Sequence, residues 1–254
     1  SIWLDSRDCF QGAPIFNLFF GEAEFRALSS LGIDGAVLGN HEFDLGSNNL
    51  YEQIINWSSF PVLAANYYFS DPSEPGAPKL KEVVQPYQVY DLDGVIVAVI
   101  GMANHSSMLG ISEGTNSLGI RPLDNTEVVT SYVALLRPVA DVVVLLSHMG
   151  LDEDEGLAPS DVVDENEALP AEGVDLILGG HLHIVLNPPR VIYRDAQNHP
   201  TLLVHSGAFA KFVGRLDLVV HVGDDNRDPE RRSFIKAVAY DTLPVSCGPR
   251  ASRA

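Results

Sequence analysis

The sequence predicts an α/β protein with a largely parallel sheet covered by helices on both sides. Short apolar runs, mostly β-branched or rich in leucine, recur from the amino end to Pro188. Segments in which apolar residues repeat at helical spacing lie between these runs. Strands that alternate with helices form parallel sheets, whereas the consecutive strand-like runs after Pro188 indicate an antiparallel section.

The elements of the parallel part follow from local composition. Brief apolar runs that end in small or polar residues predict strands at 2–5, 36–38, 62–65, 95–100, 142–146 and 174–178. Apolar spacing predicts helices at 22–31, 50–57 and 126–136. Gly32 is the expected C-cap of the first helix, and Asp124 or Asn125 is the expected N-cap of the last.

The part of the chain after Pro188 has four strand-like runs joined by polar turns, at 191–194, 201–205, 214–222 and 233–240. The longest polar stretches, 70–78 and 152–167, are expected to be surface loops. Residues 246–254 are expected to be a tail or a linker, which leaves 1–245 as one domain.

Composition narrows the function classes. Apolar residues make up 46% and charged residues 20%, as in soluble globular proteins. The net charge of −18 argues against a nucleic-acid polymer as partner, since phosphate backbones bind clustered Lys and Arg. No apolar run approaches the ~20 residues that span a bilayer. The two cysteines, Cys9 and Cys247, are expected to be unpaired thiols, with a disulfide between them as the alternative.

Four polar motifs follow predicted strands, at the sheet edge where open α/β sheets bind ligands. They read Asp5-Ser-Arg-Asp8-Cys-Phe-Gln-Gly12, Gly39-Asn40-His41-Glu42-Phe43-Asp44, Leu146-Ser147-His148-Met149-Gly150 and Gly179-Gly180-His181-Leu182-His183. One histidine after a strand is usually structural, and a Gly-Gly pair can be a turn. Imidazole, carboxylate and carboxamide groups at several strand ends together indicate a transition-metal site, and a carboxylate can bridge two ions in phosphoryl transfer.

The second and fourth motifs resemble the signature of the calcineurin-like metallophosphoesterases in its 5′-nucleotidase form, which includes bifunctional UDP-sugar hydrolases. The surrounding segments, from residue 3 to about 245, are similar as well. The resemblance implies a four-layer α/β/β/α sandwich of the metallophosphoesterase type. It also implies a phosphomonoesterase that releases phosphate from nucleotides, using two divalent metal ions such as Zn²⁺ or Mn²⁺ and a water or hydroxide that they hold.

The resemblance also implies a role for each motif residue. Asp8 would bridge the two metals, and Asn40, His148 and His181 would complete the second metal site. His183 would belong to the first site. His41 and Asp44 would form a catalytic dyad, with His41 near the scissile phosphate and Asp44 orienting its ring. The alternative for Asp44 is a helix N-cap.

The sequence departs from the family pattern at three points. The family has an Asp-x-His motif upstream of Asp8 and a separate nucleobase-binding domain at the carboxyl end, and both are expected to lie outside this chain. The absence of the first strand would leave a sheet edge exposed. Arg7 stands where the family usually has glycine, so it either weakens metal binding or points into solvent.

Several alternatives stay open. The chain could be an inactive or one-metal fragment that keeps the fold. It could also act as a cyclic-nucleotide phosphodiesterase, a nucleotide-sugar hydrolase or a thiosulfohydrolase. Cys9 is expected to point away from Asp8. The remaining histidines, His105, His199, His205 and His221, are expected to be structural or exposed, with His205 near the site. Localisation is unknown from the sequence, and the resemblance implies a periplasmic or extracellular protein.

Overall fold

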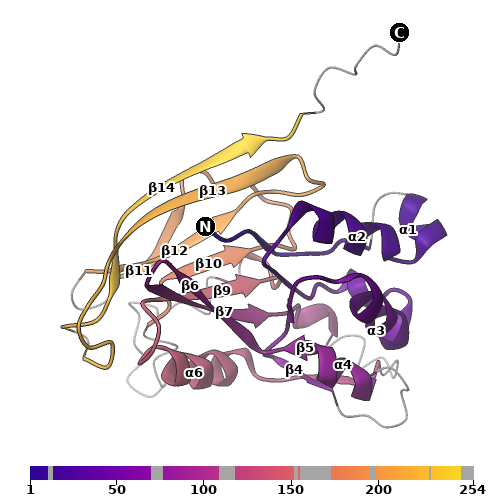
Figure 1. Ribbon diagram of the computed structural model, residues 1–254, viewed down its shortest axis with the longest axis horizontal. Coiled ribbons are helices and arrows are strands. Elements are labelled where there is room, and N and C mark those ends of the chain that lie inside the picture. Colours follow the sequence, from indigo (N-terminus) through magenta and orange to yellow (C-terminus); the bar gives the residue numbers. More distant parts are fainter. Residues whose placement is uncertain are drawn as a thin grey trace.

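Two sheets that face each other organise the chain in the computed structural model (Figure 1). The structure describes residues 1–10, 14–69, 77–108, 118–151, 154, 173–194, 198–228 and 230–246. Among the helices it describes, none has the length and apolar character needed to cross a bilayer.

The first sheet is parallel and contains the strands that precede two of the motifs. Its order is β1 (Leu4–Asp5), β2 (Gly35–Val37), β3 (Val62–Leu63) and β5 (Val84–Gln85), so β1 lies at one edge. The helices on its outer side are α1 (Pro14–Phe19), α2 (Glu22–Leu31), α3 (Gly46–Trp57) and α4 (Ala77–Val83), with the 3-10 turn η1 (His41–Phe43) after β2. Phe25, Leu50 and Ile54 contribute the buried faces of α2 and α3.

The second sheet has six strands and contains the other two motif-bearing strands. Its order is β11 (Arg190–Arg194), β12 (Pro200–His205), β10 (Leu176–Gly179), β9 (Val142–Ser147), β7 (Val95–Met102) and β6 (Tyr87–Leu92). The four inner strands are parallel, and the outer strands β11 and β6 are antiparallel to their neighbours.

Successive side chains of β9 belong alternately to two hydrophobic cores, which shows how the layers stack. Val142, Val144 and Leu146 belong to the core shared with the first sheet, whereas Val143 and Leu145 pack in a second core against helix α6 (Asn125–Leu136). Successive side chains of a strand point to opposite faces, so both faces of this sheet are buried. The order helices, sheet, sheet, helix is the four-layer sandwich that the resemblance implies.

Two smaller pairs complete the described part. β13 (Phe212–His221) and β14 (Phe234–Pro244) form a long antiparallel ribbon, and β4 (Tyr67–Phe69) pairs with β8 (Ile120–Pro122). Alternate residues of β13, among them Leu216, Leu218 and Val220, pack on the main core. The ribbon therefore covers the core with one face (Figure 1).

Most local predictions agree with the structure. Helix α2 has the predicted bounds, Gly32 caps it in a left-handed conformation, and Asp124 caps α6 by accepting the N–H of Glu127. After Pro188 the predicted antiparallel pairing is confirmed for β11 with β12 and for β13 with β14, while β12 also pairs in parallel with the earlier strand β10. The predicted loop 70–78 is wrong at its end, where α4 begins at Ala77, while 70–76 lie outside the described residues.

Candidate metal centre and active site

The carboxyl ends of strands from both sheets bring Asp8, His148 and His181 together. One ligand atom from each of these residues lies within 4.8 Å of the others. Asp8 Oδ2 is 2.9 Å from His148 Nε2, and Asp8 Oδ1 accepts the N–H of His41 at 2.9 Å. Burial opposes the charge on Asp8, but His148 and the N–H of His41 outweigh it and lower its pKa.

The donor atoms of this group fit a cation. His148 Nδ1 donates to the carbonyl of Ser6, so the other ring nitrogen, Nε2, faces the Asp8 carboxylate. Asn40 Oδ1 is buried and has no hydrogen-bond partner among the described residues. A buried polar atom without a partner is costly, and a metal ion bound to Asn40 Oδ1 would remove that cost. Asp8, Asn40, His148 and His181 are called the ligand cluster below.

Two glycines, Gly39 and Gly180, leave space for side chains of the ligand cluster. A Cβ atom on Gly39 would lie 2.1 Å from Asp8 Oδ1, and one on Gly180 would lie 3.0 Å from His148 Nδ1. The glycines of the second and fourth motifs therefore allow the backbone to pass directly behind the ligand side chains.

Glu42 holds two of the motif loops together. Its carboxylate accepts the N–H of Cys9 and the N–H of Gly39, each at 2.7 Å, and its side chain is fully buried. Burial raises the pKa of Glu42, and the Arg7 guanidinium opposes that rise. Cys9 thus joins the site through its backbone, and its free thiol is not part of the ligand cluster.

Arg7 does not point into solvent, so that alternative is wrong. The residue is 5% exposed, and its guanidinium lies over the rings of Phe25 and Phe60, 4.1 and 5.2 Å from their centroids. Its three guanidinium nitrogens have no hydrogen-bond partner among the described residues. Cation–π contact and the Glu42 charge are the interactions that compensate its burial.

His41 and Asp44 lie beside the ligand cluster. His41 Nδ1 is 3.1 Å from both carboxylate oxygens of Asp44, and the His41 side chain is 40% exposed. The N-cap alternative for Asp44 is wrong, because α3 begins at Gly46 with Leu45 as its N-cap residue.

His183 differs from the other predicted ligands. It is exposed, has a backbone φ of 57°, and packs edge-on against Phe209 at 5.0 Å between ring centroids. Burial, followed by the charges of His148, His183 and His41, lowers the pKa of His181, and the charge of Asp8 opposes this shift. His183 lies outside the group of three that the structure brings within 4.8 Å.

The expectation of a surface loop at 152–167 is wrong at Asp154, whose side chain is fully buried. It accepts from Ser147 Oγ and lies 3.1 Å from His205 Nε2. Most other residues of that stretch lie outside the described part. No local sequence signal locates this contact, because it joins residues 51 positions apart in the chain.

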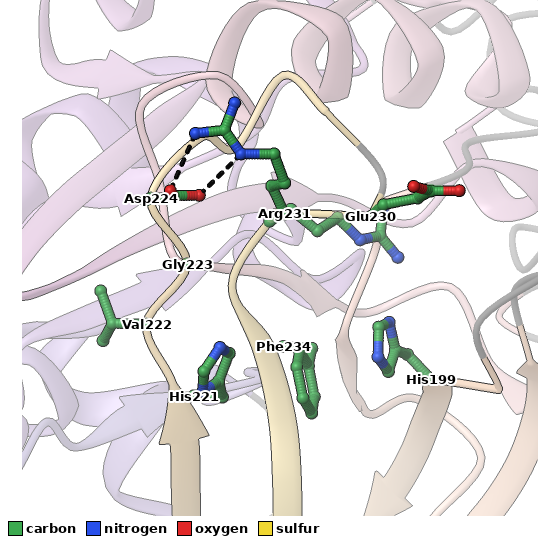
Figure 2. A pocket seen from close by; sticks show the side chains of 9 residues that line it. His199, His221, Val222, Gly223, Asp224, Glu230, Arg231 and Phe234 are labelled. Carbon is green, nitrogen blue, oxygen red and sulfur yellow. Dashed lines mark hydrogen bonds and ion pairs between the residues drawn. The ribbon is translucent and has the colours of Figure 1, made fainter.

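The histidines at the far end of the β13–β14 ribbon pack on aromatic neighbours. His199 stacks on Phe234 at 4.0 Å between centroids, and His221 lies 4.9 Å from the same ring (Figure 2). They line a hollow with Asp224 and Arg231, which form an ion pair. These contacts agree with the prediction that both histidines are structural or exposed.

Comparison with known proteins assigns the family. A model of the calcineurin-like phosphoesterases matches residues 20–185, more than half of the chain. The chain belongs to the calcineurin-like phosphoesterases. This phosphoesterase is 29% identical to the 5′-nucleotidase of Vibrio vulnificus over 260 residues, which cover 96% of this chain and 43% of that protein.

Solved structures confirm the fold of this phosphoesterase. The 5′-nucleotidase precursor from Thermus thermophilus superposes with a TM-score of 0.73 at 28% identity, over 96% of this chain and 45% of that one. The sulfate thiohydrolase SoxB from the same species gives a TM-score of 0.71 at 24% identity and shares the fold. The phosphoesterase thus spans less than half the length of these relatives.

Proposed function

We propose that this chain is the catalytic part of a metal-dependent phosphomonoesterase that releases phosphate from 5′-nucleotides. The observation that carries the proposal is the ligand cluster, with the unpartnered buried oxygen of Asn40, beside the His41–Asp44 pair. Together they form a cation site next to an exposed imidazole. A metal ion can activate water and stabilise phosphoryl charge, and an imidazole can act as a general acid, so this pairing suits phosphate ester hydrolysis.

Asp8, Asn40, His148 and His181 would hold one divalent ion, with Asp8 and His183 contributing to a second. Bound ions would supply Lewis-acid chemistry, by offsetting the phosphate charge and lowering the pKa of water. Catalytic metal sites typically have three protein ligands, so we expect the ion at Asp8 and His183 to be held weakly in this chain.

The chain's own residues would orient the phosphate and transfer a proton. The Asp44 carboxylate accepts the Nδ1 proton of His41, which leaves Nε2 directed away from Asp44 and able to face substrate. A protonated His41 would stabilise charge on a phosphoryl oxygen or protonate the leaving alkoxide. Asp8 fixes the turn that presents His41 by accepting its backbone N–H.

The relatives support a nucleotide as the substrate. Matches from bacteria to vertebrates are named 5′-nucleotidases, including those of Vibrio vulnificus and Rattus norvegicus and the venom enzyme of Crotalus adamanteus. We extend the proposal to a periplasmic or extracellular location. We also propose that substrate selectivity depends on a further domain, since this chain matches only 43% of the Vibrio vulnificus protein.

The test is phosphate release from a 5′-nucleotide by the Mn²⁺-loaded chain and by three variants. We expect Asn40→Ala and His41→Ala to lose activity, and His221→Ala, a matched exposed histidine at the far end of β13, to keep it. Unchanged activity in Asn40→Ala would contradict the proposal. A metal-loaded chain with no turnover would favour the alternative of an inactive fragment that keeps the fold.

A further inference from the structure

A buried network of three side chains lies beneath the ligand cluster. Asp154 accepts from Ser147 Oγ through Oδ1, and its Oδ2 is 3.1 Å from His205 Nε2. Ser147 and Asp154 are fully buried, and His205 is 2% exposed. Hydrogen-bonded networks in such dry surroundings hold their members rigidly, because an unmade bond leaves a costly buried polar group.

The network joins two strands across a third. Ser147 ends β9 and His205 ends β12, while β10 lies between them with Gly179 directly opposite His205. A Cβ atom on Gly179 would lie 2.1 Å from His205 Nε2 and 2.4 Å from Asp154 Oδ2. The glycine therefore opens the path through which the Asp154 carboxylate reaches from one strand end to the other.

The same strand ends carry two members of the ligand cluster. His148 directly follows Ser147, and His181 comes two residues after Gly179. Their rings meet edge-on at 5.2 Å between centroids. Any relative movement of the ends of β9, β10 and β12 would therefore change the spacing of the two imidazoles.

We propose that Ser147, Asp154 and His205 are positioning residues that set the spacing of His148 and His181 for metal binding. The inference rests on the proposed function and deepens it, because none of the three residues belongs to the ligand cluster. Groups that hold metal ligands in place typically contribute 10–100-fold in metal affinity.

The opposite ends of these strands provide a control. Thr201 on β12 donates through Oγ1 to the carbonyl of Val174 at 2.6 Å, and its side chain is as buried as that of His205. Thr201→Val removes this bond at nearly constant volume. It therefore tests the effect of a lost buried hydrogen bond at the ends of the strands that are remote from the motifs.

The experiment is a Co²⁺ titration followed by visible absorption and by competition with a chelator. It compares the unchanged chain with His205→Leu, His205→Gln, Ser147→Ala and Thr201→Val. We expect His205→Leu and Ser147→Ala to bind Co²⁺ about 10–100-fold more weakly and to shift the absorption spectrum. His205→Gln, whose amide can donate to Asp154, should retain most of the affinity, and Thr201→Val should match the unchanged chain.

The outcomes separate this inference from the proposed function. If the unchanged chain binds no Co²⁺, the proposed function itself fails. If it binds Co²⁺, and Ser147→Ala and His205→Leu match its affinity and spectrum, the positioning role is overturned while the function stands. An equal loss in Thr201→Val would also overturn it, because general loosening would then explain the effect. If His205→Leu does not fold, the Co²⁺ affinities of Ser147→Ala and His205→Gln test the positioning role.

Discussion

His41 Nδ1 lies 3.1 Å from each carboxylate oxygen of Asp44, and the 3-10 turn between them produces this contact. Side chains three residues apart on a 3-10 turn lie one above the other, so the spacing of the second motif places them together. The same turn is anchored at its start by the bond from the His41 N–H to Asp8. The proposed metal ligand Asp8 and the His41–Asp44 pair are therefore linked through one local structure.

If His41 and Asp44 act as a catalytic dyad, substituting either residue should lower turnover without lowering the metal content of the chain. We expect His41→Ala to lower kcat by about 10²–10⁴-fold, the usual contribution of a positioned acid or base. Asp44→Asn should have a smaller effect, because it keeps the ring but removes the charge that orients it. The measurement is phosphate release from a 5′-nucleotide at saturating Mn²⁺, with metal content determined on the same samples. A His41→Ala variant with normal kcat would exclude the role.

Asn40→Ala separates metal affinity from stability. Asn40 Oδ1 is buried and has no hydrogen-bond partner among the described residues. Its removal should leave the free energy of unfolding of the metal-free chain unchanged or raised, while metal affinity falls. Urea unfolding without metal and a metal titration measure the two quantities. A large loss of stability in the metal-free variant would mean that Asn40 is a structural residue.

The buried position of Arg7 predicts that two substitutions of this residue lower the stability of the fold by different amounts. Arg7→Gly would open a cavity between Phe25 and Phe60, and we expect it to cost about 2–5 kcal/mol of stability. Arg7→Met fills the same space with a flexible apolar chain and buries no charge, so we expect a loss of at most about 1.5 kcal/mol. Urea unfolding of both variants checks this. Equal losses would show that the charge, rather than the volume, is what the Phe25–Phe60 pocket requires.

Asp141 predicts a pH dependence of stability. Burial opposes its charge, but donation from Ser233, from the Ile96 N–H and from Asn226 lowers its pKa. A carboxylate with a lowered folded-state pKa stabilises the fold above its ordinary pKa, and this contribution is lost as the pH falls through the lowered value.

We therefore expect Asp141→Asn to cost about 1–3 kcal/mol at neutral pH. The difference from the unchanged chain should shrink as the pH falls below the ordinary pKa of aspartate. Urea unfolding over this pH series is the measurement, and a difference that stays constant with pH would contradict the assignment.

The local elements were predictable because their signals are local. Apolar spacing and Gly32 determine α2, and Asp124 with its bond to Glu127 determines the start of α6. The pairing of β12 was not predictable from its pattern. A strand that is buried on both faces has the same apolar sequence pattern whether its neighbour is parallel or antiparallel. β12 has one neighbour of each kind, β10 in parallel and β11 in antiparallel orientation.

The sequence predicted which motifs form the site, but not the hydrogen-bonded network of Ser147, Asp154 and His205. Histidines, carboxylates and glycines at four strand ends indicated the ligand cluster, since those residue types together suit a metal. The partnership of Asp154 with His205 depends on contact across 51 residues and on a strand order that the sequence does not display. The burial of Arg7 likewise depends on Phe60, which lies far along the chain.

The proposed metal centre is tested most directly by the metal content per chain, measured by elemental mass spectrometry after loading with Mn²⁺ or Zn²⁺ and desalting. We predict one retained ion per unchanged chain, held by Asp8, Asn40, His148 and His181, and none in His181→Ala. A chain that retains no ion, or a His181→Ala variant that retains one as firmly, would contradict the proposed centre.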